Sequence, residues 1–250
     1  MPELHTRLGR SGGAGEYREA GHEETAPAEA VAEGRAEHQV IALGSPYPLV
    51  LTGGYAVRAH RLVNRPSQDL DVATENPAPM ADIAAAVCRG LEVRGWKVQA
   101  LETAPLSARF TVTDPVTGQD CEVDILKEIF WRPVSQSPYG PVLAEEDVIG
   151  TKVRALADRG APRDLIDVFA ASRRWTNSEL EEFGRRHARG RFEGEDLQAN
   201  LTGAEWTDDE AFGAYGLDET TIAALRTWAV EWADDLAARL LEESGDPDID

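Results

Sequence analysis

One stretch, residues 49–74, constrains the fold more than any other part of the chain. It opens with four apolar or β-prone residues, which are typical of a short buried strand, and the pair Gly53 and Gly54 follows directly. Further along, Asp69 and Asp71 are separated by one residue, and residues two apart in a strand point to the same face. Two neighbouring carboxylates repel each other, so the pattern is costly unless a cation lies between them. We therefore expect a strand, a glycine turn, a helix and a second strand that presents both carboxylates.

The residue types in this stretch suit the binding of metal ions and phosphates. Carboxylate oxygens are good ligands for Mg²⁺, which usually bridges a protein to substrate phosphates. A glycine pair lets backbone N–H groups approach a phosphate near the start of a helix. A glycine pair alone, or an Asp-x-Asp alone, would be a weak signal, and a plain βα turn with a solvated acidic strand end is the alternative. The agreement of both features in spacing and alternation favours a functional site.

The segments GGYAVR and RPSQDLD together resemble the signature of polymerase β-like nucleotidyltransferases, and most of all that of the AbiEii/AbiGii-type toxin family. The resemblance implies transfer of a nucleotidyl group from an NTP to an acceptor hydroxyl, with release of pyrophosphate. It implies two Mg²⁺ ions held by Asp69 and Asp71. It also implies that Gly53, Gly54 and Ser67 cradle phosphate oxygens, and it includes Arg65 in the substrate-binding segment.

A later acidic strand supplies a candidate for a third carboxylate. The segment QDCEVDIL alternates, so that Asp120, Glu122 and Asp124 share one face and the apolar residues between them share the other. Enzymes of the resembled superfamily carry their third metal carboxylate on such a strand, which implies this role for Asp124, with Glu122 as the second candidate. A solvent-facing acidic edge is the simpler alternative.

A second charged motif lies in the part of the chain that we expect to be helical. The string from Lys152 to Asp167 resembles the second half of the toxin family's signature, which implies that Lys152 faces the triphosphate and that Arg163, Asp164 and Asp167 belong to a helix closing the site. Asp164 and Asp167 are three residues apart and so share a helical face. Two alternatives stay open: Lys152 could be an ordinary exposed lysine, and the two aspartates could serve only to orient Lys152 or Arg163.

The pattern of the whole chain predicts an α+β fold, in which a polymerase β-like core, a small mixed sheet with flanking helices, precedes an α-helical C-terminal part. A chain of 250 residues fits one large domain or two small ones. We expect a disordered tail over 1–25, a nucleotidyltransferase core over 26–130 and a helical domain over 142–250. The stretch 130–141 is rich in Pro, Ser and aromatic residues and is interpreted as a linker. The stretch 190–207 is expected to be irregular.

Composition points to a protein of the reducing cytoplasm. Cys88 and Cys121 are the only cysteines, which is too few for a disulfide framework in a chain of this length. The N-terminus carries acids and glycines where a secretory signal would carry basic and then apolar residues. No apolar run is long enough to span a membrane, so we expect no membrane partner.

The net charge of −20 is concentrated in the last third of the chain. Residues 177–250 hold 20 acidic and 6 basic residues, whereas residues 41–176 hold 17 and 15. An acidic surface repels nucleic acid, yet the resemblance implies an RNA acceptor, notably a tRNA 3′ end, and a cognate antitoxin protein. An RNA acceptor would need a local arginine strip beside the carboxylates, for which the sequence offers Arg58, Arg61, Arg65, Arg154, Arg159, Arg163, Arg173 and Arg174. Two other functions remain possible: transfer to a small aminoglycoside-like acceptor, and a catalytically silent nucleotide- or protein-binding module.

Overall fold

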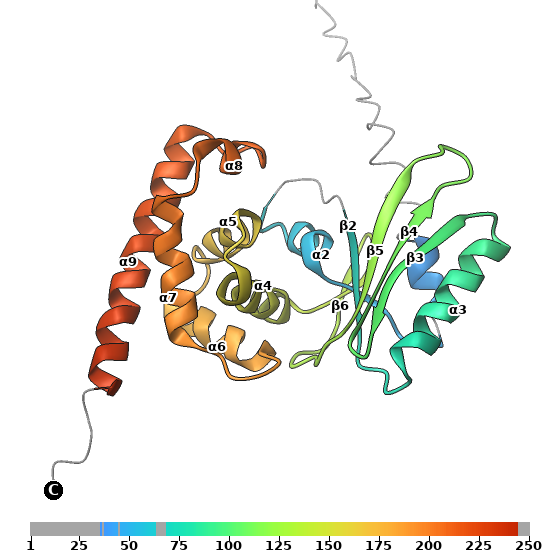
Figure 1. Cartoon of the computed structure of the whole chain (residues 1–250), viewed down its shortest axis with the longest axis horizontal. Helices are drawn as coiled ribbons and strands as arrows, with labels where there is room; N and C mark the ends of the chain where they lie inside the picture. The colour runs from blue at the N-terminus through green and yellow to red at the C-terminus, as the bar shows by residue number, and fades with distance from the viewer. Residues whose placement is uncertain (1–35, 37, 45, 64–68, 245–250) are drawn as a thin grey trace, which may run out of the picture.

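The structure is a computed structural model of the chain that describes residues 36, 38–44, 46–63 and 69–244. Figure 1 shows a sheet with its helices on one side of the molecule and a bundle of helices on the other. After a helical segment at 38–43, the elements are β1 (Val50–Leu51), α2 (Gly53–Ala59), β2 (Asp69–Thr74), α3 (Met80–Val93), β3 (Lys97–Ala104), β4 (Ser107–Thr113), β5 (Asp120–Lys127), β6 (Ser135–Ser137), β7 (Gly140–Val142), α4 (Glu145–Arg159), α5 (Pro162–Ala171), α6 (Asn177–His187), α7 (Gly194–Thr202), the 3₁₀ turn η1 (Gly203–Glu205), α8 (Asp209–Gly213) and α9 (Glu219–Ser244). The tail over 1–25 lies outside the described residues.

The described strands form one mixed sheet in the order β3-β4-β5-β2-β1-β7-β6. The pairs β2–β5 and β1–β7 are parallel, and the other neighbours are antiparallel. Helix α3 packs along β3 and β4, while α2 packs against β2 and contacts α4 (Figure 1). This arrangement confirms the expected α+β class and the small mixed sheet with flanking helices.

Strand β2 follows the alternation that the sequence predicts. Leu70 and Val72 are fully buried, whereas Asp69 and Asp71 are only partly buried and lie on the opposite face. Its last two residues are also buried, so the end of the strand lies entirely inside the molecule. The sheet therefore fixes the backbone of β2 and leaves one face of it for the two carboxylates.

Two hydrophobic cores meet within helix α4. The first joins the sheet with α2 and α3 and ends at Val148, and the second begins at Ile149 and consists of helical residues up to Leu236. A helix has neighbours on all sides, so α4 can carry one apolar surface toward the sheet and another toward α5, α6 and α7. The cores are thus joined by a continuous rigid element.

Two expectations about irregular segments are wrong. The stretch 130–141 contains β6 and most of β7, and β7 pairs with β1 through Leu51 and Val142, so this stretch belongs to the sheet. The stretch 190–207 contains α7 and η1. Leu197 and Leu201 lie one helical turn apart and are both fully buried, which is enough to dock an otherwise polar helix.

None of the helices among the described residues is both long enough and apolar enough to cross a membrane.

Candidate active site

A cleft of about 660 Å³ lies between one face of the sheet and helices α4 and α5. Its lining comes from segments far apart in the chain: Thr52, Gly53, Gly54, Asp69, Asp71, Glu102, Ser107, Arg109, Asp124, Leu126, Glu128, Thr151, Lys152, Arg154, Ala155, Arg159, Arg163, Asp164, Arg189, Ala214, Tyr215 and Gly216. We call the lining residues on β2 to β5 the sheet wall of the cleft, and the lining residues on α4 and α5 its helical wall.

Strand pairing assembles the carboxylates of the sheet wall. In the parallel register of β2 and β5, Asp69 lies beside Glu122 and Asp71 lies beside Asp124. Residues in register on neighbouring strands point to the same face, so four carboxylates share one small area. The structure thus brings Asp124 next to the Asp-x-Asp pair although it lies on a later hairpin.

The carboxyl group of Asp71 has a raised pKa. Burial raises the pKa of Asp71 to about 6; Lys152 opposes the rise, and Asp124 and Asp69 add to it. The first residue of α2, Gly53, lies against the same side chain: its φ is 58°, and a Cβ at this position would collide with the Asp71 carboxylate. Gly53 therefore has a clear structural reason: only glycine lets the backbone pass this close to Asp71.

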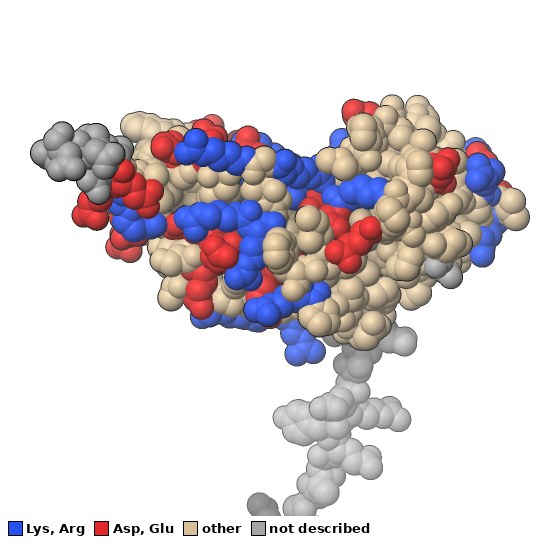
Figure 2. All heavy atoms as spheres, turned by 90° about the horizontal axis from the view of Figure 1, so that it is seen from below, with Lys and Arg blue, Asp and Glu red and all other residues tan. Residues whose placement is uncertain are grey.

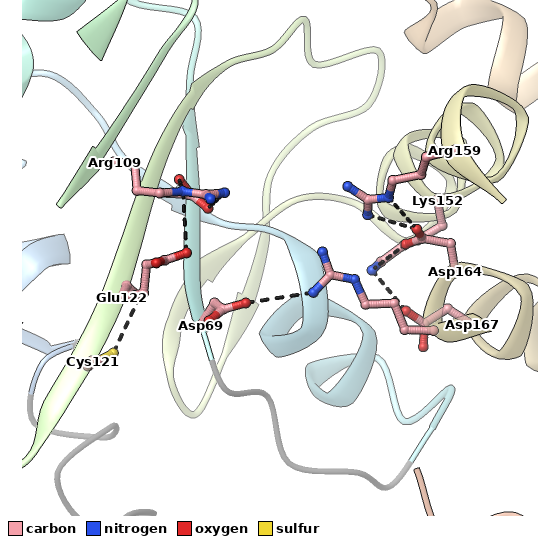
Figure 3. A network of polar contacts seen from close by, with 10 residues as sticks. Asp69, Arg109, Cys121, Glu122, Lys152, Arg159, Asp164 and Asp167 are labelled. Atoms are coloured by element: carbon pink, nitrogen blue, oxygen red, sulfur yellow. Dashed lines mark hydrogen bonds and ion pairs between the residues drawn. The ribbon is translucent and has the colours of Figure 1, made fainter. Parts of the chain in front are cut away.

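Arg109 on β4 neutralises part of the sheet wall. Its Nε and one Nη each donate to one oxygen of Asp124 at 2.8 Å, and Nε lies 3.3 Å from Glu122 (Figure 3). The bidentate bond to Asp124 raises the pKa of Arg109 above its already high ordinary value. Sequence reasoning missed Arg109, although a signal existed: the turn at Asp114 sets Thr113 opposite Asp120, and counting back along the hairpin sets Arg109 opposite Asp124.

The helical wall is built around one buried lysine. Lys152 Nζ lies 2.9 Å from Asp167 and 3.3 Å from Asp164, and both aspartates are fully buried (Figure 3). Burial alone would lower the pKa of Lys152, but Asp167 and Asp164 outweigh it, and the net effect is a raised pKa. Arg159 binds the second oxygen of Asp164 at 2.7 Å. The alternative of an ordinary exposed lysine is therefore wrong.

The two walls are linked across the cleft by charge. Arg163, at the start of α5, lies 3.7 Å from Asp69 on β2. Gly160 ends α4 in the left-handed conformation and Pro162 starts α5, so the chain turns sharply and directs both Arg159 and Arg163 toward the cleft. The helical wall therefore presents cations to the carboxylates of the sheet wall.

A third ionic group in the cleft lining, which the sequence analysis also missed, is centred on Glu128. Glu128, just after β5, is buried and bound at both oxygens by Arg154, each at 2.9 Å, and Arg189 adds a third bond at 2.9 Å. Arg154 also donates to the carbonyl of His187 on α6. These bonds tie the sheet to the helices, and no spacing rule links residues so far apart in the sequence.

The structure assembles most of the predicted site residues. Gly53, Gly54, Asp69, Asp71, Asp124, Lys152, Arg163 and Asp164 all line the cleft. Asp167 does not line it and instead supports Lys152 from behind. Arg65 and Ser67 lie outside the described residues.

The predicted arginine strip is only partly assembled. Arg154, Arg159 and Arg163 line the cleft, joined by the unpredicted Arg109 and Arg189. Arg58, Arg61, Arg173 and Arg174 do not line it, and Arg174 instead binds Glu145 and the carbonyl of His60; Arg65 lies outside the described residues. Figure 2 shows Lys and Arg atoms across the middle of one face, with acidic atoms among them. The basic surface is therefore interrupted by carboxylates.

Asp69 and Asp71 have the chemistry that a Mg²⁺ ion requires, since they are hard oxygen donors on one face of a rigid strand. The raised pKa of Asp71 shows that this carboxylate gains from added positive charge. Among the described residues, however, no three His, Cys, Asp or Glu side chains stand together in a metal-binding arrangement. Both oxygens of the expected third ligand, Asp124, are occupied by Arg109.

Comparison with known proteins agrees with this geometry. Residues 42–244 match the family described as nucleotidyl transferase AbiEii toxin of the type IV toxin-antitoxin system. Among solved structures, the chain is similar to the nucleotidyltransferase toxin MenT4 of Mycobacterium tuberculosis, with 18% identity, a TM-score of 0.54 and coverage of 81% of this chain and 82% of that one. A putative nucleotidyltransferase of Helicobacter pylori gives 15% identity, a TM-score of 0.53 and coverage of 89% and 100%. No curated protein matches.

The match spans most of the chain, including the glycine turn, the carboxylate strands and the lysine helix. It confirms the resemblance drawn from the two motifs. Membership implies an NTP substrate and an antitoxin partner. The chain belongs to the AbiEii family of nucleotidyltransferase toxins.

Proposed function

We propose that this nucleotidyltransferase toxin moves a nucleotidyl group from an NTP to the 3′ hydroxyl of an RNA, and that the transfer depends on Mg²⁺. The observation that carries the proposal is the opposition of charges across the cleft: Asp69 and Asp71 on one wall, and Lys152, Arg159 and Arg163 on the other. The phosphate oxygens of an NTP need basic side chains, and the Mg²⁺ ions bound to the same phosphates need carboxylates on the opposite side. The cleft volume of about 660 Å³ is also within the range of small-molecule sites.

The residues of the helical wall would bind and orient the triphosphate. Lys152 is held by two buried aspartates, so its ammonium is fixed before a ligand arrives and loses little freedom on binding. Arg159 is half exposed, which leaves donors for a phosphate oxygen while one Nη stays on Asp164. The N–H groups of the glycine turn at the start of α2 would meet phosphate oxygens from the other side.

The residues of the sheet wall would hold the metal and the reacting hydroxyl. Asp69 and Asp71 would ligate Mg²⁺, with Asp124 as a third carboxylate, and bound Mg²⁺ supplies charge neutralisation at the phosphates and a lower pKa of the acceptor hydroxyl. Two such ions are part of the proposal. Asp124 would also accept the proton of that hydroxyl, and its position in the cleft beside Asp71 supports this role.

The acceptor would enter along the basic residues that the cleft contains. Arg109 on β4 and Arg189, just after α6, are both partly exposed and line the cleft. Contacts with phosphates make binding weaker at higher salt, with a slope of about −0.7 in log–log terms for each phosphate neutralised on a single strand. Because the cleft has few accessible cations, we expect the affinity for RNA to fall only slightly with salt. This is the behaviour expected when a protein contacts only one end of an RNA.

Labelled NTPs, tested one at a time, separate the proposed function from its alternatives. The purified protein would be incubated with Mg²⁺ and, in parallel, with total RNA, an aminoglycoside panel or a protein lysate. We expect label on RNA in wild type and none with Asp71→Asn, which is matched in size. Label only on an aminoglycoside or a protein would overturn the RNA acceptor, and absence of any Asp71-dependent label would overturn the proposed activity.

A further inference from the structure

The third carboxylate of the sheet wall already has a cation. Both oxygens of Asp124 accept hydrogen bonds from Arg109, each at 2.8 Å. A guanidinium in this position presents two parallel donors to the two oxygens, which is the strongest geometry for such a pair. Each oxygen has a second lone pair, but a metal ion bound there would lie beside the guanidinium and be repelled by it, so Arg109 opposes metal binding by Asp124 unless it moves.

The two partners differ in their freedom to move. The Asp124 side chain is 12% exposed and sits on a strand between β2 and β4, whereas the Arg109 side chain is 50% exposed. Arg109 also has a second carboxylate within reach, because its Nε lies 3.3 Å from Glu122, whose side chain is 34% exposed. A shift of the guanidinium from Asp124 to Glu122 would keep it paired throughout.

We propose that Arg109 is a positioning residue that holds Asp124 until a divalent cation arrives, and that it then transfers to Glu122. This inference rests on the proposed function in that it takes the cation to be Mg²⁺ bound by Asp69 and Asp71. Arg109 and the cation compete for Asp124, since both carry positive charge and the same oxygens serve both. The assignment gives Glu122 a role as the alternative partner of Arg109, and it leaves the metal ligation to the three aspartates.

The competition has a measurable consequence. When Arg109 is replaced by Gln, the cation at Asp124 is lost and divalent binding should become tighter. An opposite charge this close changes the ionisation equilibrium of a carboxylate by a factor of ten or more, so we expect about tenfold tighter binding of Mn²⁺ by Arg109→Gln. Arg109→Lys keeps the charge without the two parallel donors and should give an intermediate affinity.

The test measures Mn²⁺ affinity by calorimetry on the full chain, with a non-hydrolysable NTP analogue present and no acceptor. The matched control is Arg132→Gln, because Arg132 is 52% exposed, is paired with Glu146 and lies outside the cleft. This control changes the net charge equally and should leave the affinity at the wild-type value. An affinity of Arg109→Gln equal to that of wild type would overturn the inference.

Thermal melting supplies a second readout. Without metal, Arg109→Gln should melt below wild type because Asp69, Asp71 and Asp124 then repel each other with less compensation. Saturating Mn²⁺ should restore the loss, so the variant should show the larger metal-induced rise. A purely structural arginine would give a loss that Mn²⁺ does not restore, and that result also counts against the inference.

A double-mutant cycle tests the role of Glu122. If Glu122 receives Arg109, then Glu122→Gln should weaken Mn²⁺ binding in wild type and have a clearly smaller effect in Arg109→Gln. Equal effects in both backgrounds would mean that the two residues act independently and would overturn this role.

The failure of the inference and that of the proposed function are distinguishable. If Asp71→Asn abolishes Mn²⁺ binding while Arg109→Gln leaves it unchanged, only the inference fails. If wild type binds no Mn²⁺ in the presence of the NTP analogue, both are overturned.

Discussion

The two walls of the cleft hold carboxylates in opposite ways. On the helical wall, Asp164 and Asp167 are fully buried, and Lys152 and Arg159 satisfy them. On the sheet wall, Asp69, Asp71 and Asp124 lie beside Glu122, which does not line the cleft, and the four carboxylates share the cations Arg109 and Arg163. The helical wall is nearly balanced in charge, whereas the sheet wall has more carboxylates than cations.

The difference in pairing indicates that aspartates have separate roles on the two walls of the cleft. Buried aspartates that are fully paired stabilise one geometry, and their removal leaves a partner unpaired. Partly buried aspartates that repel each other raise the free energy of the folded protein and gain from an added cation. Substitutions that remove one carboxylate should therefore affect mainly stability on one wall and mainly activity on the other.

The largest effect is expected from Asp71→Asn. Transfer should fall by more than about a hundredfold, because even partners that only support metal ligands contribute 10- to 100-fold. The melting temperature should stay the same or rise, since the change removes repulsion with Asp69 and Asp124. Turnover and melting curves check both parts. Asp120→Asn, an exposed residue on the same strand face as Asp124, is the control; turnover close to wild type in Asp71→Asn would remove the functional contrast between the walls.

Asp164→Asn should produce the opposite result on the helical wall. It leaves Lys152 and Arg159 with a weakened partner inside the protein, and breaking a buried ion pair costs about 3–5 kcal/mol. Urea unfolding measures the free energy of unfolding. Joint replacement of Lys152, Asp164 and Asp167 by apolar residues should destabilise less than loss of Lys152 alone, because no buried charge is then left unpaired and the half-exposed Arg159 can be solvated. A loss below about 1 kcal/mol in Asp164→Asn would contradict the structural role of this group.

Glu128 gives the contact between the walls a pH dependence. Burial alone would raise its pKa, but bonds from Arg154 and Arg189 outweigh burial, and the pKa is lowered below its ordinary 4.5. A carboxyl whose pKa is lower in the folded than in the unfolded protein contributes stability above pH 4.5, and this contribution is lost as the pH falls through the folded pKa. Melting temperatures from about pH 6 downward should therefore fall less steeply below pH 4.5 in Glu128→Gln than in wild type. The exposed Glu92→Gln serves as the control, and parallel curves for Glu128→Gln and wild type would rule out this contribution.

The smallest effect is expected from Arg159→Gln. Asp164 keeps Lys152, and Arg159 is half exposed, so the free energy of unfolding should change by about 1 kcal/mol or less. Affinity for an NTP should fall severalfold while affinity for the nucleoside stays constant, because only the triphosphate carries the charge that Arg159 would meet. If Arg159→Gln weakens binding of the NTP and of the nucleoside equally, Arg159 does not contact the phosphates, and Lys152 is then the remaining candidate phosphate ligand among the residues paired with Asp164.

The sequence predicted best where a short motif or a clear alternation carried the information. The alternation of β2 and β5 indicated the correct faces of Asp69, Asp71 and Asp124, and the family resemblance brought Lys152 into the same site. Arg109 was missed because its importance comes from a cross-strand register. The contact of Glu128 with Arg189 was missed because it depends on how the helices dock against the sheet.

The elements missed in the fold have a similar explanation. Strands β6 and β7 have three residues each, too few to show a period, and Pro141 argues against a strand when neighbours are unknown. Helix α7 depends on two buried leucines in a stretch that is otherwise polar. In each case a local pattern was too short to identify the element, and tertiary packing decided the outcome.

The parallel pairing of β7 with β1 has a consequence for how the protein is made. Translation delivers β1 and its glycine turn early, yet the N–H of Leu143, which bonds to the carbonyl of Leu51, leaves the ribosome only after β2 to β6 have been synthesised. Until then β1 has an open edge, and an open edge can pair with a strand from another chain. A nascent or prematurely terminated chain that lacks β7 would thus expose the strand leading into the glycine turn, and such chains should be more prone to aggregation and more dependent on chaperones than the full-length protein.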